Sequence, residues 1–257
     1  MTPLPSVAIP ALGMSGLPSP ASPRRAMDPT VEVPEYLART YAWAYLNPVN
    51  VRLLDRDCVA NTILWGNYRR LTRAACNEFQ RGEHVLQAAS VYGSQPEQLA
   101  KRLGPAGRLE ILDVSELQVR RQRRRLAALP NVTVRLADAA LPGNGTYDAV
   151  CCFFLLHEIP DTYKHRVVPA LLARVRPGGR VVFVDYARPQ WFHPLRGLMA
   201  LINYWLEPYA ASLWRHPIRS FAANAVGFSW TERRLFLGLY QVVVATRVNR
   251  PGEKAPP

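Results

Sequence analysis

Residues Val85–Gly93, VLQAASVYG, are the stretch that decides the fold. An apolar strand ends here in a turn, and a helical segment follows. In nucleotide-binding α/β proteins such a turn carries several glycines and an acid, which bring the backbone and a carboxylate close to the ligand. This turn instead has Gln87, Ala89 and Val91, and only Gly93 remains of the expected glycines. The site is therefore lost, misread from the sequence, or rebuilt for different chemistry.

Apolar segments alternate with helical ones downstream of this turn. Alternation of this kind predicts right-handed crossovers and a mostly parallel sheet. The segment 233–247, RRLFLGLYQVVVATR, predicts two closing strands joined at Gly238. The expected parallel strands are HVLQAAS (84–90), RLEILDV (108–114), NVTVRLAD (131–138), YDAVCCFFLL (147–156) and RVVFVDYA (180–187).

The flanks differ in composition from this core. Residues 1–33 are rich in Pro, Ser and Ala and predict a disordered tail, as do the polar residues 249–257. Residues 34–82 predict a helical cap, in which 61–79 continue as one amphipathic helix. Residues 187–222 interrupt the strand–helix rhythm and form an apolar insertion.

The chain is strongly basic, with a formal net charge of +13 and a pI of about 10.1. This charge predicts an anionic partner, either lipid or nucleic acid, although a biased genome is an alternative source of arginine. The arginine-rich run Arg120–Arg125 has no interleaved aromatic residues, so we interpret it as a solvated helix face and do not expect nucleic-acid binding. The aromatic insertion 187–222 favours an anionic membrane surface or a lid over an apolar substrate; the alternative is an ordinary hydrophobic cap.

Cysteine usage and targeting signals indicate the compartment. The four cysteines show no C-x-x-C spacing, which favours reduced thiols in a reducing compartment. No segment reaches the roughly 20 apolar residues of a spanning helix. The N-terminal residues lack a secretory pattern and have only weak features of an organellar transit peptide.

Acidic residues follow the second and third expected strands. Asp113 comes 20 residues after Gly93, at the interval that suits hydrogen bonding to a ribose diol. Asp138 is expected to receive an adenine amino group. A helix cap is the alternative role for each, although Ser115 already provides a cap next to Asp113.

Polar residues also end the fourth and fifth strands, which are otherwise apolar. His157 and Glu158 end FFLLHEIPD, and Asp185 lies in VVFVDYARP. Polar groups in such surroundings need partners. The three side chains together offer nitrogen and oxygen ligands to a hard divalent metal such as Mg²⁺ or Mn²⁺. The alternative for His157 and Glu158 is helix-start chemistry.

The order of these motifs resembles S-adenosylmethionine-dependent methyltransferases. It implies a Rossmann-like α/β fold of the class I methyltransferase type over 34–248, with seven mostly parallel strands, the last inserted antiparallel. N-terminal helices precede the sheet and a helical insertion follows strand 5. The resemblance implies that the cofactor contacts Gln87, Ala89, Tyr92, Gly93, Asp113, Asp138 and Ala139.

A narrower resemblance rests on YLARTYAWAYLNP, ILWGNYRRL, VLQAASVYG, FFLLHEIPD and LEPYAASLWRHPIR. Over residues 35–247 the chain is similar to the rhodoquinone biosynthesis family, which converts ubiquinone to rhodoquinone. The resemblance implies replacement of a ring methoxy group by an amino group, with S-adenosylmethionine as amino donor and a divalent metal, manganese, assisting. It also implies a cytoplasmic protein, peripheral on the inner membrane of a bacterium, with the mitochondrial matrix side as the alternative.

This chemistry suggests roles for the unusual turn. An acid beside the α-ammonium group of the cofactor would hold its proton, and Gln87 removes that charge. Ala89 and Val91 would displace the amino-acid part toward the quinone, and Tyr92 would orient it. His157 is the third expected catalytic residue. The aromatic residues expected to contact the substrate are Tyr41, Tyr68 and Trp191.

Two other functions remain open on the sequence. An ordinary methyltransferase acting on a lipophilic quinol or phenol would share the fold and the apolar insertion, but would leave the altered turn unexplained. A non-catalytic domain with a decayed cofactor loop would bind a membrane or a partner. Retention of Asp113, Asp138 and the His157–Glu158 pair argues against decay.

Overall fold

The computed structural model describes residues 34, 50, 54–222 and 226–248. The tails predicted over 1–33 and 249–257 lie outside these residues, as does Tyr41, one of the three expected substrate contacts. Most of the predicted cap, from residue 54 onward, and the whole core are described.

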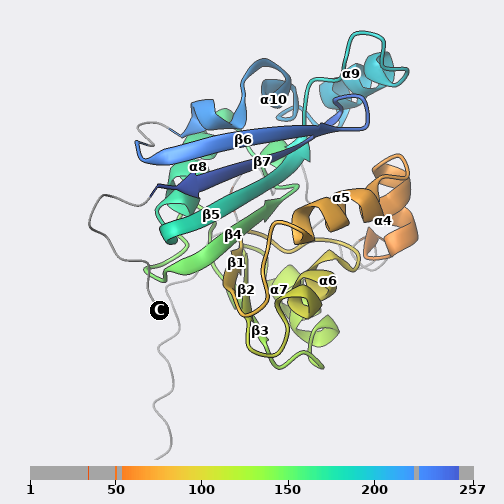
Figure 1. Cartoon of the computed structure of the whole chain (residues 1–257). Helices are drawn as coiled ribbons and strands as arrows, with labels where there is room; N and C mark the ends of the chain where they lie inside the picture. The colour runs from red at the N-terminus through yellow and green to blue at the C-terminus, as the bar shows by residue number, and fades with distance from the viewer. Residues whose placement is uncertain (1–33, 35–49, 51–53, 223–225, 249–257) are drawn as a thin grey trace, which may run out of the picture. The chain divides into compact units, whose positions relative to one another are not determined.

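The core is a seven-stranded sheet with the order β3-β2-β1-β4-β5-β7-β6 (Figure 1). All neighbouring pairs from β3 to β5 are parallel, and β7 is antiparallel to both β5 and β6. The predicted α/β fold and the antiparallel insertion of the last strand are confirmed. The strands are β1 (His84–Gln87), β2 (Arg108–Asp113), β3 (Val132–Leu136), β4 (Tyr147–Phe153), β5 (Val175–Tyr186), β6 (Phe228–Leu235) and β7 (Tyr240–Arg247).

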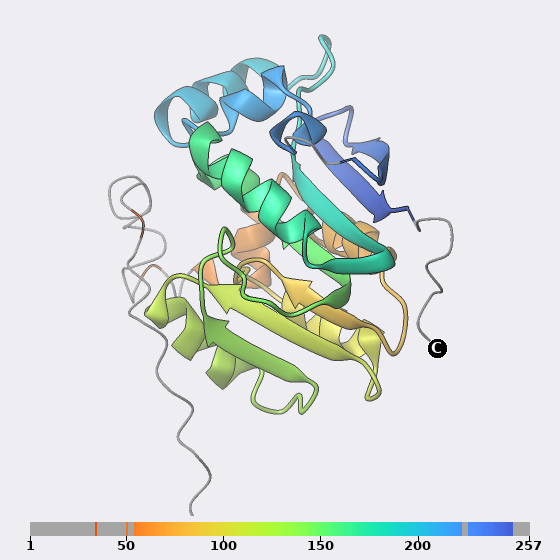
Figure 2. The ribbon, with the colours of Figure 1, turned by 90° about the vertical axis from the view of Figure 1, so that its left-hand side faces the viewer.

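Helices cover both faces of the sheet (Figure 2). Alternate residues of β5 divide between the two apolar layers, because side chains of a strand point to opposite faces in turn. Val182 and Val184 pack in the layer of α5, α6 and α7, whereas Val181 and Phe183 pack in the layer of α8 and α10. The helices are α4 (Asp57–Ile63), α5 (Tyr68–Cys76), α6 (Gln95–Leu103), α7 (Glu116–Arg125), α8 (Asp161–Leu172), α9 (Arg196–Trp205) and α10 (Ala211–Arg215), with 3₁₀ turns η1 (Leu156–Glu158) and η2 (Ile218–Phe221).

The strand order reverses beside β1, which places a ligand site at its carboxyl end. Gln87, the last residue of β1, pairs with Ile111 of β2 on one side and with Cys151 of β4 on the other. In open parallel sheets, ligands bind beyond the carboxyl ends of the strands at this switch point. The turn after Gln87 therefore lies at the expected position of a cofactor.

The single helix predicted over 61–79 is wrong, because the chain breaks it between α4 and α5. Trp65 and Gly66 have φ of 52° and 77°, which no α-helix accommodates. The break is held by Asn67, whose side-chain amide donates to the carbonyls of Leu64 and Trp65 at 3.2 and 2.9 Å. As a result, Leu64 and Trp65 both line a cavity next to the sheet.

The insertion predicted over 187–222 forms α9, α10 and η2. Lys164 of α8 ties it to the core: its buried ammonium group donates to Asp161, to the carbonyl of Tyr209 and to the hydroxyl of Ser212 at 2.6–2.9 Å. In the part of the chain that the structure describes, every helix is too short or too polar to cross a bilayer.

Candidate functional site

The turn after β1 is held by side chains rather than by a run of glycines. The carbonyl of Val91 accepts hydrogen bonds from Gln122 at 2.8 Å and from Arg121 at 3.0 Å, both on α7. From the cap, Asp57 accepts from the backbone and hydroxyl of Ser94 at 2.6 and 2.7 Å. The Tyr68 hydroxyl accepts from the Gln95 amide at 2.7 Å and donates to the carbonyl of Tyr92 at 3.2 Å. The turn is therefore ordered from two sides.

Gly93 is required where these groups converge. Its φ is +77°, a conformation that favours glycine. A Cβ atom there would lie 2.5 Å from the Tyr68 hydroxyl and 2.8 Å from a carboxylate oxygen of Asp57. The one glycine that the turn keeps thus makes room for the cap.

Two arginines of the basic run also hold this region. Arg121 lies 3.1 Å from Asp55 and stacks its guanidinium group over the Tyr92 ring at 4.5 Å. Arg125 pairs with Asp55 and, at 3.0 Å, with Glu97. The prediction of a solvated face is therefore wrong for Arg121 and Arg125, because only part of the α7 circumference faces solvent.

A small cavity of about 50 Å³ lies between the turn and the ends of β2 and β3. Asp113 accepts from the backbone N–H groups of Ser90 and Ser115 at 3.0 and 2.8 Å. A carboxylate offers about four acceptor positions, so acceptor capacity remains for a diol. The residues that line this cofactor cavity are Ala88, Ala89, Ser90, Asp113, Val114, Ser115, Ala137, Asp138, Ala139, Leu155, Glu158, Ile159, Tyr163 and Val167.

Asp138 forms the far end of the cofactor cavity. One of its carboxylate oxygens accepts from the Ala140 amide at 2.7 Å, and the other accepts from the Tyr163 hydroxyl of α8. Burial is the main cause that raises the pKa of Tyr163, and the Asp138 carboxylate adds to it. The cavity therefore has carboxylates at two places and small alanines between them, which leaves room for a flat ligand.

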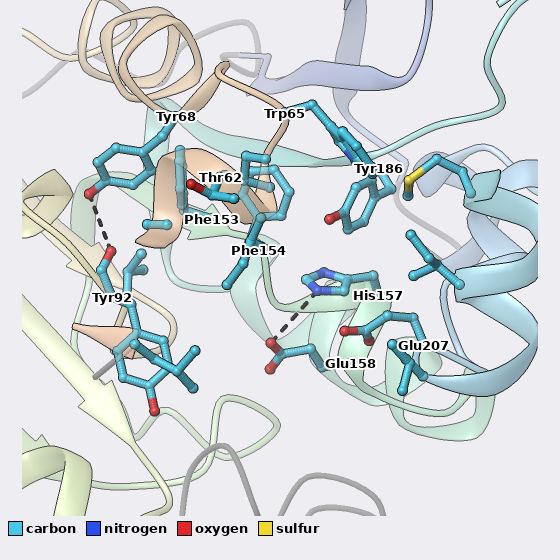
Figure 3. A pocket seen from close by; sticks show the side chains of 18 of the residues that line it. Thr62, Trp65, Tyr68, Tyr92, Phe153, Phe154, His157, Glu158, Tyr186 and Glu207 are labelled. Atoms are coloured by element: carbon cyan, nitrogen blue, oxygen red, sulfur yellow. Dashed lines mark hydrogen bonds and ion pairs between the residues drawn. The ribbon is translucent and has the colours of Figure 1, made fainter. Parts of the chain in front are cut away.

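A larger cavity of about 370 Å³ adjoins the first (Figure 3). Ser90 and Glu158 line both, so a group held in one cavity faces the other across these two residues. The larger cavity is lined mainly by apolar side chains, and we call it the apolar cavity. Its walls are Leu54, Ala60, Thr62, Ile63, Leu64, Trp65, Tyr68, Ser90, Val91, Tyr92, Phe153, Phe154, His157, Glu158, Tyr186, Met199, Ile202, Leu206 and Glu207.

Polar groups gather on one wall of the apolar cavity. His157, Glu158, Tyr186 and Glu207 lie together there (Figure 3). The Nε2 atom of His157 is 3.7 Å from a carboxylate oxygen of Glu158. Phe154 and Tyr186 pack edge-on against the imidazole ring, at 5.6 and 5.0 Å between centroids, and hold its orientation.

Asp185 fixes His157 from behind. Its carboxylate accepts from the backbone N–H groups of Leu156, His157 and Tyr186 at 2.7–3.3 Å and lies 3.0 Å from Nδ1 of the imidazole. Burial alone would lower the pKa of His157, but the charges of Asp185, Glu207 and Glu158 outweigh it and raise the pKa to about 9. His157 is therefore protonated at neutral pH and has a proton to donate.

The fold and part of the sequence match known methyltransferases. A family model described as a methyltransferase domain matches residues 85–179. The structure is similar to an O-methyltransferase family protein from Burkholderia thailandensis, with a TM-score of 0.61 and 18% identity over 82% of this chain and 64% of that chain. It also resembles the N-methyltransferase NodS from Bradyrhizobium japonicum, solved with S-adenosylhomocysteine (TM-score 0.52, 15% identity, 78% and 93% covered). The protein thus has the fold of these methyltransferases.

Curated proteins that part of this chain resembles include C-methyltransferases of ubiquinone and menaquinone biosynthesis. The ubiquinone/menaquinone biosynthesis C-methyltransferase UbiE of Idiomarina loihiensis is 28% identical over 131 residues, which are 49% of this chain and 50% of the relative. UbiE of Cronobacter sakazakii is 24% identical over 143 residues, 54% of this chain and 56% of the relative. The chain thus spans about half the length of the curated relatives that it matches.

Five of the predicted cofactor contacts line the two cavities. Ala89, Asp113, Asp138 and Ala139 line the cofactor cavity, and Tyr92 lines the apolar one. The two others, Gln87 and Gly93, lie beneath and beside the turn.

Gln87 is sealed under the turn and is not among the described residues that line either cavity. Its amide nitrogen donates to the Ala89 carbonyl at 3.1 Å, and its Oε1 atom is buried without a described partner. Gln87 therefore supports the turn from beneath and does not line a cavity.

Some of the predicted catalytic and substrate residues line the apolar cavity, and others point away from it or lie outside it. His157 belongs to the polar wall, but the Tyr92 hydroxyl accepts from Gln118 at 2.9 Å and points away from that wall (Figure 3). Tyr68 lines the apolar cavity with its ring. Trp191 is 81% exposed and is not among the residues that line the apolar cavity, so its contact with a substrate stays a prediction.

The predicted metal trio does not fit a metal. Both oxygens of Asp185 already face backbone N–H donors, and one of them lies against Nδ1 of His157. Among the described residues, no three or more His, Cys, Asp or Glu side chains are grouped as metal ligands are. Asp185 instead orients His157.

Sequence reasoning missed three contributors to the site. Glu207 is the only acid between Tyr186 and Phe221, a signal that was available in the sequence. Tyr163 and Tyr186 gave no comparable signal, because helix and strand interiors contain many tyrosines. Their placement in the site depends on the packing of α8 and β5 beside η1.

Proposed function

We propose that this protein binds S-adenosylmethionine in the cofactor cavity and a lipophilic quinone in the apolar cavity, and transfers a group to the quinone ring. The observation that carries the proposal is that Ser90 and Glu158 line both cavities. A cofactor in one cavity and a quinone in the other would therefore be neighbours. The similarity to C-methyltransferases of ubiquinone and menaquinone biosynthesis supports a quinone as the acceptor.

The polar wall suits chemistry at a quinone carbonyl or alkoxy group. A protonated His157 is able to donate a proton to an oxygen that gains charge, and Glu158 is placed to accept one from a nucleophile arriving from the cofactor side. The surrounding apolar side chains exclude water, which strengthens these interactions.

The finer proposal is replacement of a ring methoxy group by an amino group. A quinone carbon that bears methoxy is a vinylogous ester: the amine nitrogen of S-adenosylmethionine adds to it, forming a C–N bond, and the C–O bond breaks. The nitrogen of this adduct still carries the α-carbon of the cofactor. Loss of the Cα proton reduces the ring to the quinol and leaves a Cα=N imine, which water hydrolyses to the aminoquinol and the 2-oxo acid of the cofactor. Glu158 takes the proton that the amine loses, and His157 protonates methoxide as it leaves as methanol. Gln87 supports this choice, since an acid at its position would favour the charged, unreactive ammonium group.

A second candidate, methyl transfer to a quinol ring, is favoured by the printed function of the curated relatives. One experiment separates the two. The protein is incubated with ubiquinone, and in parallel with a reduced quinol that keeps one unsubstituted ring carbon, together with S-adenosylmethionine that carries nitrogen-15 in the amine and carbon-13 in the methyl group. Amination predicts a labelled nitrogen in the ring product, methyl transfer predicts a gain of labelled methyl, and neither label in the quinone overturns the proposal.

The role of Gln87 is tested by a pair of substitutions. Gln87→Glu introduces a charge at constant size and is expected to suppress amination at least tenfold, whereas Gln87→Met is expected to keep it. The exposed Gln98→Glu on α6 controls for an added carboxylate. Circular dichroism and binding of S-adenosylhomocysteine report whether each variant is folded. Equal loss in the Glu and Met variants would contradict the charge argument.

A further inference from the structure

The outer surface of α9 and the segment before it is unusually apolar for a solvent-facing surface. Trp191 is 81%, Tyr204 75% and Trp205 70% exposed. Large apolar side chains that gather on one surface indicate an interaction site. We call this set the outer rim; it consists of Trp191, Phe192, Leu198, Leu201, Tyr204 and Trp205.

α9 carries the other four residues of the outer rim on one face, and its adjacent face forms part of the wall of the apolar cavity. Met199, Ile202 and the following Leu206 line the cavity, while Leu201 and Trp205 are exposed. Leu206 is also exposed, and so is Ile63, which lines the same cavity from α4. These two residues therefore mark a mouth of the cavity between α4 and α9, beside the outer rim.

The charged residues near the outer rim are mostly positive, which favours an anionic partner. The segment from Tyr186 to Phe221 contains four arginines and one acid, Glu207, which faces the cavity. Arg188 is exposed, and neither it nor Arg196 has an acidic partner among the described residues. Tryptophan and tyrosine flanked by unpaired cations suit the interface of an anionic bilayer, where rings enter the headgroup region and cations meet lipid phosphate.

We propose that the outer rim seats on an anionic lipid bilayer and that a lipid-soluble substrate enters the apolar cavity from the bilayer through the mouth between Ile63 and Leu206. The entry route rests on the proposed function, because it requires a lipophilic quinone as substrate. Seating on the bilayer does not, since it follows from the exposed aromatic residues and the arginines alone.

Vesicle binding tests the seating. The full chain is expected to sediment with phosphatidylcholine vesicles that contain phosphatidylglycerol, and at least tenfold more weakly with phosphatidylcholine alone. Leu201→Glu/Trp205→Glu is expected to weaken binding to the anionic vesicles at least tenfold. Val226→Glu, in the turn before β6 and 93% exposed, adds the same kind of charge outside the outer rim and is expected to leave binding unchanged.

A measurement on the unmodified chain tests the proposal even if the substituted variants do not fold. Brominated lipids are expected to quench its tryptophan fluorescence in anionic vesicles, and Trp191→Phe/Trp205→Phe is expected to remove most of that quenching. Absence of quenching in the unmodified chain overturns the proposal. So does a dimer that the Glu variant converts to a monomer without loss of vesicle binding, since the outer rim would then be a subunit interface.

Turnover separates the entry route from the function itself. With a long-tailed quinone held in vesicles, Leu201→Glu/Trp205→Glu is expected to lose at least tenfold in rate, but to keep its rate with a short-tailed, water-soluble quinone. Equal loss on both quinones overturns the entry route. No turnover of either quinone by the unmodified chain means that the proposed function has failed, and vesicle binding then still decides the seating.

Discussion

The two cavities share a wall but are built in different ways. The cofactor cavity lies where β1, β2 and β3 end, and backbone N–H groups and carboxylates shape it. The apolar cavity is assembled from α4, the turn after β1, the end of β4 and α9, which are distant in sequence. The sheet edge thus forms one cavity, whereas helices and turns added around it form the other. The difference teaches that fold predicts the first ligand better than the second.

The largest effect on turnover is expected from a substitution in the polar wall of the apolar cavity. His157→Gln is expected to reduce turnover of the quinone about 100- to 1,000-fold, because the site loses its general acid. Affinity for S-adenosylhomocysteine, measured by calorimetry, is expected to change less than about threefold, since His157 does not line the cofactor cavity.

His165→Gln is the matched control for that substitution. His165 is an exposed histidine on α8 that lines neither cavity among the residues described. A His157 variant that turns over normally, or a His165 variant that is equally slow, would contradict the assignment of the acid to His157.

Gly93→Ala tests whether the turn depends on the cap. Its Cβ would meet the Tyr68 hydroxyl at 2.5 Å and occupy a φ of +77°, so the free energy of unfolding is expected to fall by about 2–4 kcal/mol. Gly66→Ala has the same φ but no atom within 4 Å of its Cβ, and is expected to cost only about 1 kcal/mol. Urea unfolding measures both; equal losses would mean that the contact with Tyr68 is unimportant.

The raised pKa of His157, in the wall of the apolar cavity, predicts that the free energy of unfolding depends on pH. Its pKa is raised to about 9, so its contribution is complete below its ordinary pKa of about 6.5 and is lost as pH rises through 9. Between these values the free energy of unfolding is expected to fall by at most about 3 kcal/mol. The fall is expected to be smaller in His157→Gln; parallel pH profiles would show that other groups cause it.

A smaller effect is expected from a substitution in the cofactor cavity, and it should alter binding of the cofactor but not of the quinone. Asp113→Asn is expected to weaken binding of S-adenosylhomocysteine about 10- to 30-fold, as a charged acceptor of ribose hydroxyls is lost. Binding of a quinone analogue, followed by quenching of tryptophan fluorescence, is expected to remain within about threefold. Asp148→Asn is the control, because Asp148 lies at the start of β4 and bonds the His84 amide and Arg176. An equal loss in both variants would indicate a general structural effect.

Much of the sheet was predictable from local patterns. Apolar runs such as YDAVCCFFLL identify strands buried on both faces, and their alternation with helices implies the crossovers. Boundaries were less predictable: β5 begins at Val175, before the RPGG sequence expected to form a turn, because it continues its pairing with β4 past a bulge. The break at Trp65–Gly66 was missed because hydrophobic periodicity continues across it.

The sequence by itself determined the sheet, its switch point and the acids Asp113 and Asp138, because these depend on local periodicity and on positions at strand ends. Only the tertiary structure decided that Gln87 lies beneath the turn, that Asp185 orients His157 instead of binding a metal, and that Trp191 faces outward. The physical reason is that a side chain's role depends on the direction it takes and on the neighbours it meets. Both are set by packing between segments far apart in the chain.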